Sequence, residues 1–227
     1  MIVRCVGLSS LFFLSALSCY ASEELEPIVV EASVFEGREI DDFAQSITIL
    51  NSKELEQKKS ASIGETVDGE LGVSSTYFAP GVSRPIIRGL GSNRVRVLEN
   101  GIDSSDASSV SEDHAVSIEP YISRQIEILR GPATLRYGSG AIGGVINVVN
   151  KRLPQTLEGK SLDVDIHAEH ATVSDGNTVA VDLNGVYESF AWHIDGLTRD
   201  TNDYEINGFA SESEADNRGV LKNSDIE

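Results

Sequence analysis

Residues able to bind a metal ion are concentrated in one polar stretch, residues 103–118 (DSSDASSVSEDHAVSI). Asp113 and His114 stand side by side in this stretch and offer a carboxylate and an imidazole, both common ligands of zinc. Two ligands are too few for a stable zinc site, which usually has four. A histidine in a polar loop is also often an ordinary surface residue, so the sequence chemistry leaves both interpretations open. Further carboxylates lie nearby in sequence: Asp103, Asp106 and Glu112.

The other candidate catalytic groups form no convergent set. His167 and His170 are three residues apart, which places them on opposite faces of a strand, so we assign no site to them. The glycine-rich residues 138–144 (GSGAIGG) lack the Gly-Lys-Ser/Thr ending of a phosphate-binding P-loop. Both cysteines fall within residues 1–21, so the rest of the chain has no cysteine chemistry. We expect a protein that is not an enzyme and binds no catalytic cofactor; a secreted soluble α+β enzyme is a remote alternative.

Composition narrows the classes of partner. The chain has 227 residues, with 18 Lys and Arg against 36 Asp and Glu, and a formal net charge of −18. A hydrophobic fraction of 40% can supply a core, which excludes wholesale disorder. The acidic surplus argues against a nucleic-acid partner, because phosphates attract basic surfaces. The same surplus would suit a cationic ligand.

Both ends of the chain differ from a folded domain. Residues 1–21 combine Arg4, an apolar run and small residues up to Ala21, which predicts a signal peptide for export through the Sec pathway. A lipoprotein signal cleaved before Cys19 is a minor alternative. Residues 208–227 are polar, acidic and turn-rich, without a capping or stop signal. We therefore expect either a loose tail or a chain that has been truncated.

Residues 45–152 are predicted to form an α+β domain. Two helices are expected, the first ending near Gln57 and the second spanning residues 62–71 from a capping box at Ser62. A further helical turn is expected from Gly131 to Tyr137. Runs of β-branched and aliphatic residues predict strands at 46–50, 84–88, 94–98, 125–129 and 145–149.

Residues 153–227 begin with strict alternation of apolar and polar residues. Three stretches show it, at 162–169, 179–184 and 190–195, and each places apolar side chains on one face and charged ones on the other. Strands of this length and pattern are typical of a transmembrane β-barrel. The edge of an ordinary sandwich with one solvated face is the alternative. Three strands cannot close a barrel, so this would be its incomplete start.

Three motifs resemble the plug domain of TonB-dependent outer-membrane receptors: residues 84–101 (RPIIRGLGSNRVRVLENG), 124–132 (RQIEILRGP) and 136–151 (RYGSGAIGGVINVVNK). The resemblance implies a plug at 45–152 inside a barrel of roughly 22 strands, in the outer membrane of a Gram-negative bacterium. Its partners would be outer-membrane lipid and TonB of the inner-membrane energy-transducing complex. If residues 1–227 were the whole protein, we would expect no transport, since the barrel would stay open.

The resemblance also implies roles for particular residues. Residues 22–44 would hold the TonB box, an extended segment to which TonB adds as a strand; an ordinary first strand is the alternative. Arg88, Glu127 and Arg130 would form ion pairs that latch the plug to the barrel, although surface charges of this kind often contribute little. The residues matching the TonB box are Glu26, Pro27, Ile28, Val29, Val30, Glu31 and Ala32.

The ligand interpretation rests on the polar stretch around Asp113 and His114. It resembles zinc-uptake members of the family, in which such a pair at the plug apex contributes zinc ligands and the barrel supplies the others. This implies Zn²⁺ as a transported ligand. The alternative is a receptor of the same architecture for an iron-siderophore complex, haem or cobalamin.

Overall fold

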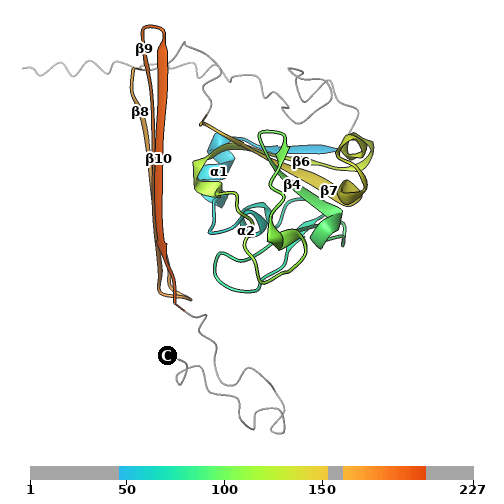
Figure 1. The fold of residues 1–227 in the computed structure, drawn as a ribbon. Helices are drawn as coiled ribbons and strands as arrows, with labels where there is room; N and C mark the ends of the chain where they lie inside the picture. Colours follow the sequence, from blue (N-terminus) through green and yellow to red (C-terminus); the bar gives the residue numbers. More distant parts are fainter. Residues whose placement is uncertain (1–45, 153–160, 203–227) are drawn as a thin grey trace, which may run out of the picture.

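The computed structural model describes residues 46–152 and 161–202. Residues 46–152 fold as an α+β domain, and residues 161–202 form a separate antiparallel sheet that stands beside it (Figure 1). The strands of the two parts run across one another (Figure 1). Within the described ranges, no helix is long and apolar enough to cross a membrane.

The α+β domain is built on a five-stranded sheet with the order β1-β6-β7-β4-β5. Its central strands β6 (Ser123–Leu129) and β7 (Gly144–Asn150) are antiparallel, and β7 pairs in parallel with β4 (Val95–Glu99). The edges are β1 (Ile47–Leu50) and the short β5 (Ile102–Asp103). The strands predicted at 46–50, 94–98, 125–129 and 145–149 are thereby confirmed.

The two predicted helices are present, the second shorter than expected. Helix α1 (Ser52–Lys58) starts from a capping box between Asn51 and Glu54, which satisfies two otherwise free backbone N–H groups. Helix α2 (Ile63–Val67) starts at Ser62 as predicted but does not reach residue 71, since Gly69 and Gly72 adopt positive φ angles that bend the chain away. The chain then enters a two-stranded sheet of β2 (Val73–Ser75) and β3 (Pro85–Ile87).

Short 3₁₀ helices make up most of the remaining regular structure. The predicted turn of Gly131–Tyr137 is one of them, η5. Another, η4 (Pro120–Ile122), comes directly before β6 and is capped by the Glu119 side chain. The others are η2 (Ser92–Arg94), η3 (Ala107–Ser109) and η6 (Ser139–Ala141).

The hydrophobic core lies between the five-stranded sheet, the two helices and the β2–β3 pair. Ile126, Ile128 and Ile146 from the central strands are completely buried there. They pack in one cluster with Leu55 of α1 and Ile63 of α2. The α+β domain therefore has its apolar side chains inside, as in a water-soluble protein.

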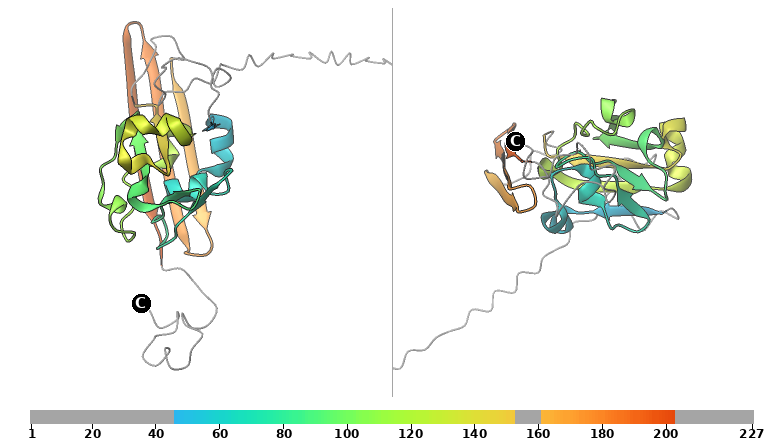
Figure 2. Two further views of the ribbon diagram at one scale, coloured as in Figure 1. Left: turned by 90° about the vertical axis from the view of Figure 1, so that its right-hand side faces the viewer. Right: turned by 90° about the horizontal axis from the view of Figure 1, so that it is seen from below.

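The second sheet, which we call the outer sheet, consists of β8 (Asp163–Ala171), β9 (Gly176–Tyr187) and β10 (Phe190–Asp200) in the order β10-β9-β8. Figure 2 shows it as a separate layer at one side of the α+β domain. The predicted alternation is confirmed, and the apolar residues form the exposed face: Ile166 is 70% and Ile194 60% exposed. Asp182 is buried instead, on the face toward the α+β domain.

Candidate functional site

Asp113 and His114 lie in the loop between η3 and η4, and they contact each other. His114 Nδ1 is 2.9 Å from Asp113 Oδ1, and each side chain is about half exposed, at 54% and 49%. The Ser111 hydroxyl also donates to Asp113; this bond and the one from His114 lower the pKa of the Asp113 carboxyl. The carboxylate therefore fixes the orientation of the imidazole ring and leaves Nε2 as the outward nitrogen.

The neighbouring carboxylates of the polar stretch are engaged elsewhere. Asp106 accepts hydrogen bonds from Ser108 and Ser117. Burial raises the pKa of the Asp106 carboxyl, but these hydrogen bonds outweigh burial and lower it. Asp106 Oδ1 also lies 3.6 Å from Arg84 Nη1. Asp103 pairs with Arg96. Among the described residues, no group of three or more His, Cys, Asp or Glu side chains is placed to hold a metal ion. The loop alone thus brings together the Asp113–His114 pair and no complete site.

The three predicted latch residues, Arg88, Glu127 and Arg130, occupy different environments. Glu127 on β6 is fully buried and accepts hydrogen bonds from Gln125 (2.8 Å) and Asn147 (3.1 Å). Arg130 is 3% exposed and donates to Thr48 Oγ1 at 2.8 Å, and burial lowers its pKa. Arg88 is exposed, with a positive φ of 51°. The contacts of Glu127 and Arg130 stated here lie within the α+β domain, so their role as a latch stays a prediction.

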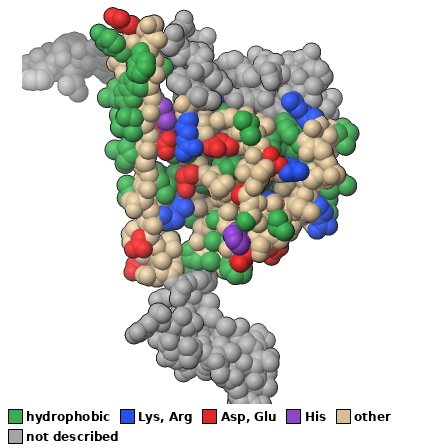
Figure 3. Space-filling view, in the orientation of Figure 1, with side chains coloured by type: hydrophobic (Ala, Val, Ile, Leu, Met, Phe, Trp, Pro, Cys, Tyr) green, Lys and Arg blue, Asp and Glu red, His purple; other side chains and the backbone are tan. Residues whose placement is uncertain are grey.

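The α+β domain meets the outer sheet along a seam of polar side chains that the sequence did not reveal. Arg152 and Asp195 are 43 residues apart, and Glu119 and Arg199 are 80 residues apart, so no local sequence pattern predicts these contacts. Figure 3 shows charged side chains gathered between the two parts and hydrophobic ones along the far side of the outer sheet. The seam is formed by Lys59, Glu119, Tyr121, Lys151 and Arg152 from the domain and by Asp165, His167, Glu169, Asp195 and Arg199 from the outer sheet.

One part of the seam is centred on Tyr121 in η4. Its hydroxyl donates to Glu169 Oε2 at 2.7 Å, and its ring lies 4.4 Å from the His167 ring. Burial, and next the Glu169 carboxylate, raise the pKa of Tyr121. Beside it, Arg199 donates to both oxygens of Glu119 at 3.1 and 3.2 Å. His167 therefore lies on the face of β8 that is turned toward the α+β domain.

The other part of the seam contains a row of three aspartates. Asp182 on β9 stands directly opposite Asp165 on β8 and Asp195 on β10. Like charges opposite one another destabilise a sheet unless cations compensate them. Lys151 pairs with Asp165, and Arg152 Nε lies 3.0 Å from Asp195 Oδ1. The two cations that follow β7 thus pair with two of the three aspartates in this row.

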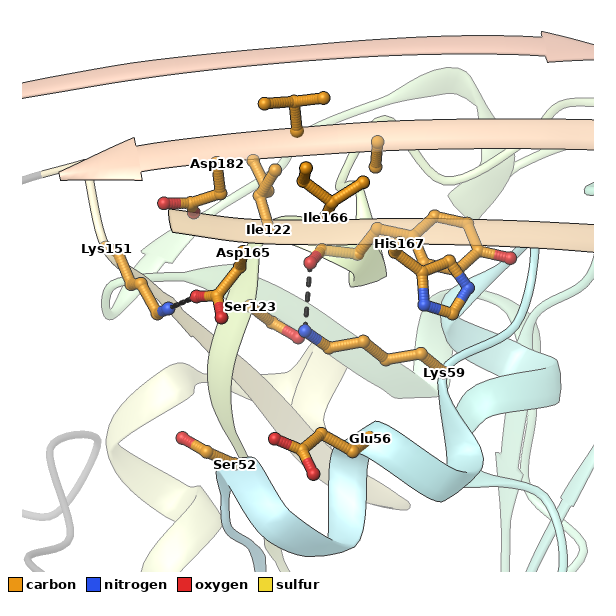
Figure 4. A pocket seen from close by; sticks show the side chains of 13 residues that line it. Ser52, Glu56, Lys59, Ile122, Ser123, Lys151, Asp165, Ile166, His167 and Asp182 are labelled. Carbon is orange, nitrogen blue, oxygen red and sulfur yellow. Dashed lines mark hydrogen bonds and ion pairs between the residues drawn. The ribbon is translucent and has the colours of Figure 1, made fainter. Parts of the chain in front are cut away.

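A cavity of about 250 Å³ separates α1 and η4 from β8 and β9 next to this row. Lys59, Lys151, Asp165 and Asp182 line it (Figure 4). Lys59 Nζ donates to the Tyr121 carbonyl at 2.9 Å; burial, followed by the charge of Lys151, lowers its pKa. Asp182 Oδ2 is buried without a hydrogen-bond partner among the described residues. The cavity has charged side chains both on the side of the α+β domain and on the side of the outer sheet, so it differs from the apolar core of the domain.

Two predicted features lie outside the described residues: the signal peptide at 1–21 and the TonB box at 26–32. The acidic segment after residue 202 lies outside them as well. They remain predictions from the sequence.

Comparison with known proteins gives one consistent answer. The TonB-dependent Receptor Plug Domain family matches residues 39–145. The iron-regulated outer membrane virulence protein of Vibrio cholerae is 26% identical over 217 residues, covering 92% of this chain and 33% of that protein. The vitamin B12 transporter BtuB of Vibrio vulnificus is 28% identical over 163 residues, covering 70% and 26%. The chain thus spans about a third or less of the length of these relatives.

Solved structures agree on the fold. The ferric enterobactin receptor PfeA superposes with a TM-score of 0.57 at 22% identity, covering 72% of this chain and 26% of that one. The siderophore receptor PirA of Acinetobacter baumannii gives 0.54 at 22%, covering 68% and 24%. The described residues are a TonB-dependent receptor plug domain followed by antiparallel strands. The chain is an outer-membrane protein of a Gram-negative bacterium, and we call residues 46–152 the plug from here on.

Proposed function

We propose that this chain is the N-terminal part of a TonB-dependent outer-membrane receptor that takes up a scarce nutrient, and that the nutrient is a divalent metal ion such as zinc. The architecture supports the transport role. The plug rests against the polar face of the outer sheet, and the opposite face is apolar, as a lipid-facing wall requires. TonB would engage residues 26–32 and supply the energy.

The Asp113–His114 pair carries the metal part of the proposal. Histidines that bind metals usually donate their second ring N–H to a carboxylate or carbonyl, which fixes the ring. The 2.9 Å contact between His114 Nδ1 and Asp113 provides this arrangement and leaves Nε2 for the ion. The pair supplies at most two ligands, so the remaining ligands would come from other parts of the receptor.

Zinc binding by the receptor in detergent, measured by calorimetry, tests the metal assignment. We expect His114→Ala, which removes a ligand, and Asp113→Ala, which removes the support of the ring, each to weaken binding about 10- to 100-fold. His170→Ala is the matched control, because His170 is an exposed histidine that contacts Asn177 on the outer sheet. Equal zinc affinity in all variants would contradict the metal assignment and leave the transport role intact.

The second candidate is a receptor for an iron chelate, haem or cobalamin. It is favoured by the relatives, which include a vitamin B12 transporter and a siderophore receptor. It also has a structural observation in its support: Tyr77 and Phe78, between β2 and β3, are 49% and 62% exposed. Exposed aromatic rings suit a large planar or aromatic ligand.

Arg84 connects the two features: its backbone N–H donates to Thr76, next to Tyr77, and its side chain donates to Ser108 and faces Asp106 in the polar stretch that contains Asp113. Uptake by cells given one nutrient at a time separates the candidates. Zinc uptake lost in His114→Ala supports the first. Uptake of an iron chelate or cobalamin that is lost when Tyr77 and Phe78 are both changed to Ala supports the second.

A further inference from the structure

The seam has two places where neighbouring plug residues contact both edge strands of the outer sheet: Lys151 with Arg152, and Glu119 with Tyr121. Tyr121 reaches His167 and Glu169 on β8, and Glu119 holds Arg199 on β10. We propose that Glu119 and Tyr121 are the fastener that holds the plug to this wall, and that parting Glu119 from Arg199 frees this side of the plug. The release step rests on the proposed transport function; the fastening itself does not.

The contacts of Tyr121 fix its ring on several sides. The residue is 5% exposed, although it lies on a surface of the plug. Its hydroxyl donates to Glu169, its ring centroid lies 4.4 Å from that of His167 with the two rings tilted by 32°, and the guanidinium carbon of Arg199 lies 5.4 Å from the ring centroid. An aromatic residue that inserts in this way between polar partners combines apolar burial with directional bonds.

Glu119 links this aromatic contact to the ion pair. Its carboxylate accepts from the Tyr121 backbone N–H at 3.3 Å and also receives both hydrogen bonds from Arg199 Nη2. The same side chain therefore caps η4 and binds the wall. Removal of Arg199 would loosen Glu119 and with it the backbone that positions the Tyr121 ring.

The pairs elsewhere on the seam are poorer fasteners. The side chains of Arg199 and Glu119 are 21% and 23% exposed, whereas Asp165 is 58% exposed in its pair with Lys151 and Arg152 is 45% exposed in its pair with Asp195. Exposed ion pairs contribute little because water and salt screen them. Because its ion pair is less exposed, the Glu119–Tyr121 contact is the tighter of the two parts of the seam.

The position of Glu119 and Tyr121 in the chain connects the fastener to the central sheet of the plug. Glu119 and Tyr121 come directly before β6, the strand that pairs with both β1 and β7. Strand β1 is the first described element after the segment that carries the predicted TonB box. A displacement of β1 would act on β6 through four paired positions, Ile47 to Leu50 against Leu129 to Ile126, and so on the fastener.

Charge reversal at the ion pair tests the fastener. In the receptor purified from outer membranes, we expect Arg199→Glu to speed amide hydrogen exchange at residues 119–123 at least tenfold. The double variant Glu119→Arg/Arg199→Glu restores opposite charges but not the cap on η4, so it should recover part of this protection. The amides of β4 and β7 report whether the plug is still folded, and they should not change.

Lys58→Glu is the matched control, since it reverses a charge in an ion pair with Glu70 inside the plug. Unchanged exchange at 119–123 in Arg199→Glu, the same change in Lys58→Glu, or no recovery in the double variant would each overturn the fastener. Zinc and iron-chelate uptake are measured separately on the same proteins. A receptor that transports neither nutrient contradicts the proposed function, while the exchange result still decides the fastener.

Discussion

Strands β6 and β8 have comparable side chains and opposite surroundings. In β6, Ile126 and Ile128 are completely buried in the plug core. In β8, Val164 and Ile166 are 46% and 70% exposed, on the face turned away from the plug. The same aliphatic residues thus form an interior in one sheet and an exposed apolar face in the other, which the proposed transport function assigns to lipid.

The contact between the plug and the outer sheet is polar, and this matters for the proposed transport function, in which the plug has to separate from the wall. A dry apolar interface between plug and wall would have to expose hydrophobic area to separate. The seam instead consists of ion pairs, hydrogen bonds and a polar cavity, whose partners water can replace. The plug can therefore keep a firm core of its own and a separable contact with the wall.

Truncation of a buried aliphatic residue should give the largest effect. Ile128→Ala removes a completely buried side chain from β6, and we expect it to destabilise the plug by about 2–5 kcal/mol. Hydrogen exchange of β6 and β7 in denaturant measures this loss. Ile194→Ala, at a position of β10 that is 60% exposed, should leave the plug unchanged. Equal losses in both variants would show that the two sheets share one core.

A charge on the lipid-facing side should give a somewhat smaller effect, confined to the wall. Ile194→Lys places a cation on the outer face of β10, which costs about 2–4 kcal/mol where the residue lies near the bilayer midplane. Unfolding from phospholipid vesicles in urea measures it, with Ile194→Leu as the control. If Ile194→Lys were neutral in vesicles, the outer face would not face lipid.

Much of this fold could be predicted from local patterns in the sequence. The cap of α2 at Ser62, the strands of the plug and the alternation in β8 and β9 all depend on neighbouring residues, and all are present. The second helix was predicted too long because the positive φ of Gly69 and Gly72 outweighs the helical pattern around Leu71. Conformational freedom at glycine cannot be read from periodicity alone.

The seam could not be predicted in the same way. Tyr121 and Glu169 are 48 residues apart, and Glu119 and Arg199 are 80 residues apart, so their meeting depends on how two sheets pack. The sequence analysis chose Arg88, Glu127 and Arg130 as the latch from motif resemblance. Glu127 is hydrogen-bonded within the plug to Asn147, a contact that follows from the pairing of β6 with β7, and its role as a latch stays a prediction.

The smallest expected effect concerns one hydrogen bond of the seam and its pH dependence. Tyr121→Phe removes the donor to Glu169 and should weaken the plug–wall contact by about 1 kcal/mol at neutral pH. The pKa of Tyr121 is raised in the folded protein, chiefly by burial, above the ordinary value of about 10. Above about pH 10 the unfolded chain loses the phenol proton while the folded chain keeps it, so stability falls as the pH rises.

The alkaline loss should therefore be smaller in Tyr121→Phe than in the unmodified protein when exchange at residues 119–123 is followed above about pH 10. Tyr137→Phe is the control, because burial raises the pKa of Tyr137 as well but this residue lies on η5, within the plug. It should reduce the alkaline loss of the plug and leave residues 119–123 unaffected. If the alkaline loss of protection at residues 119–123 persisted in Tyr121→Phe, another titrating group would control the seam. The separable contact between plug and wall would then not depend on the Tyr121 hydroxyl.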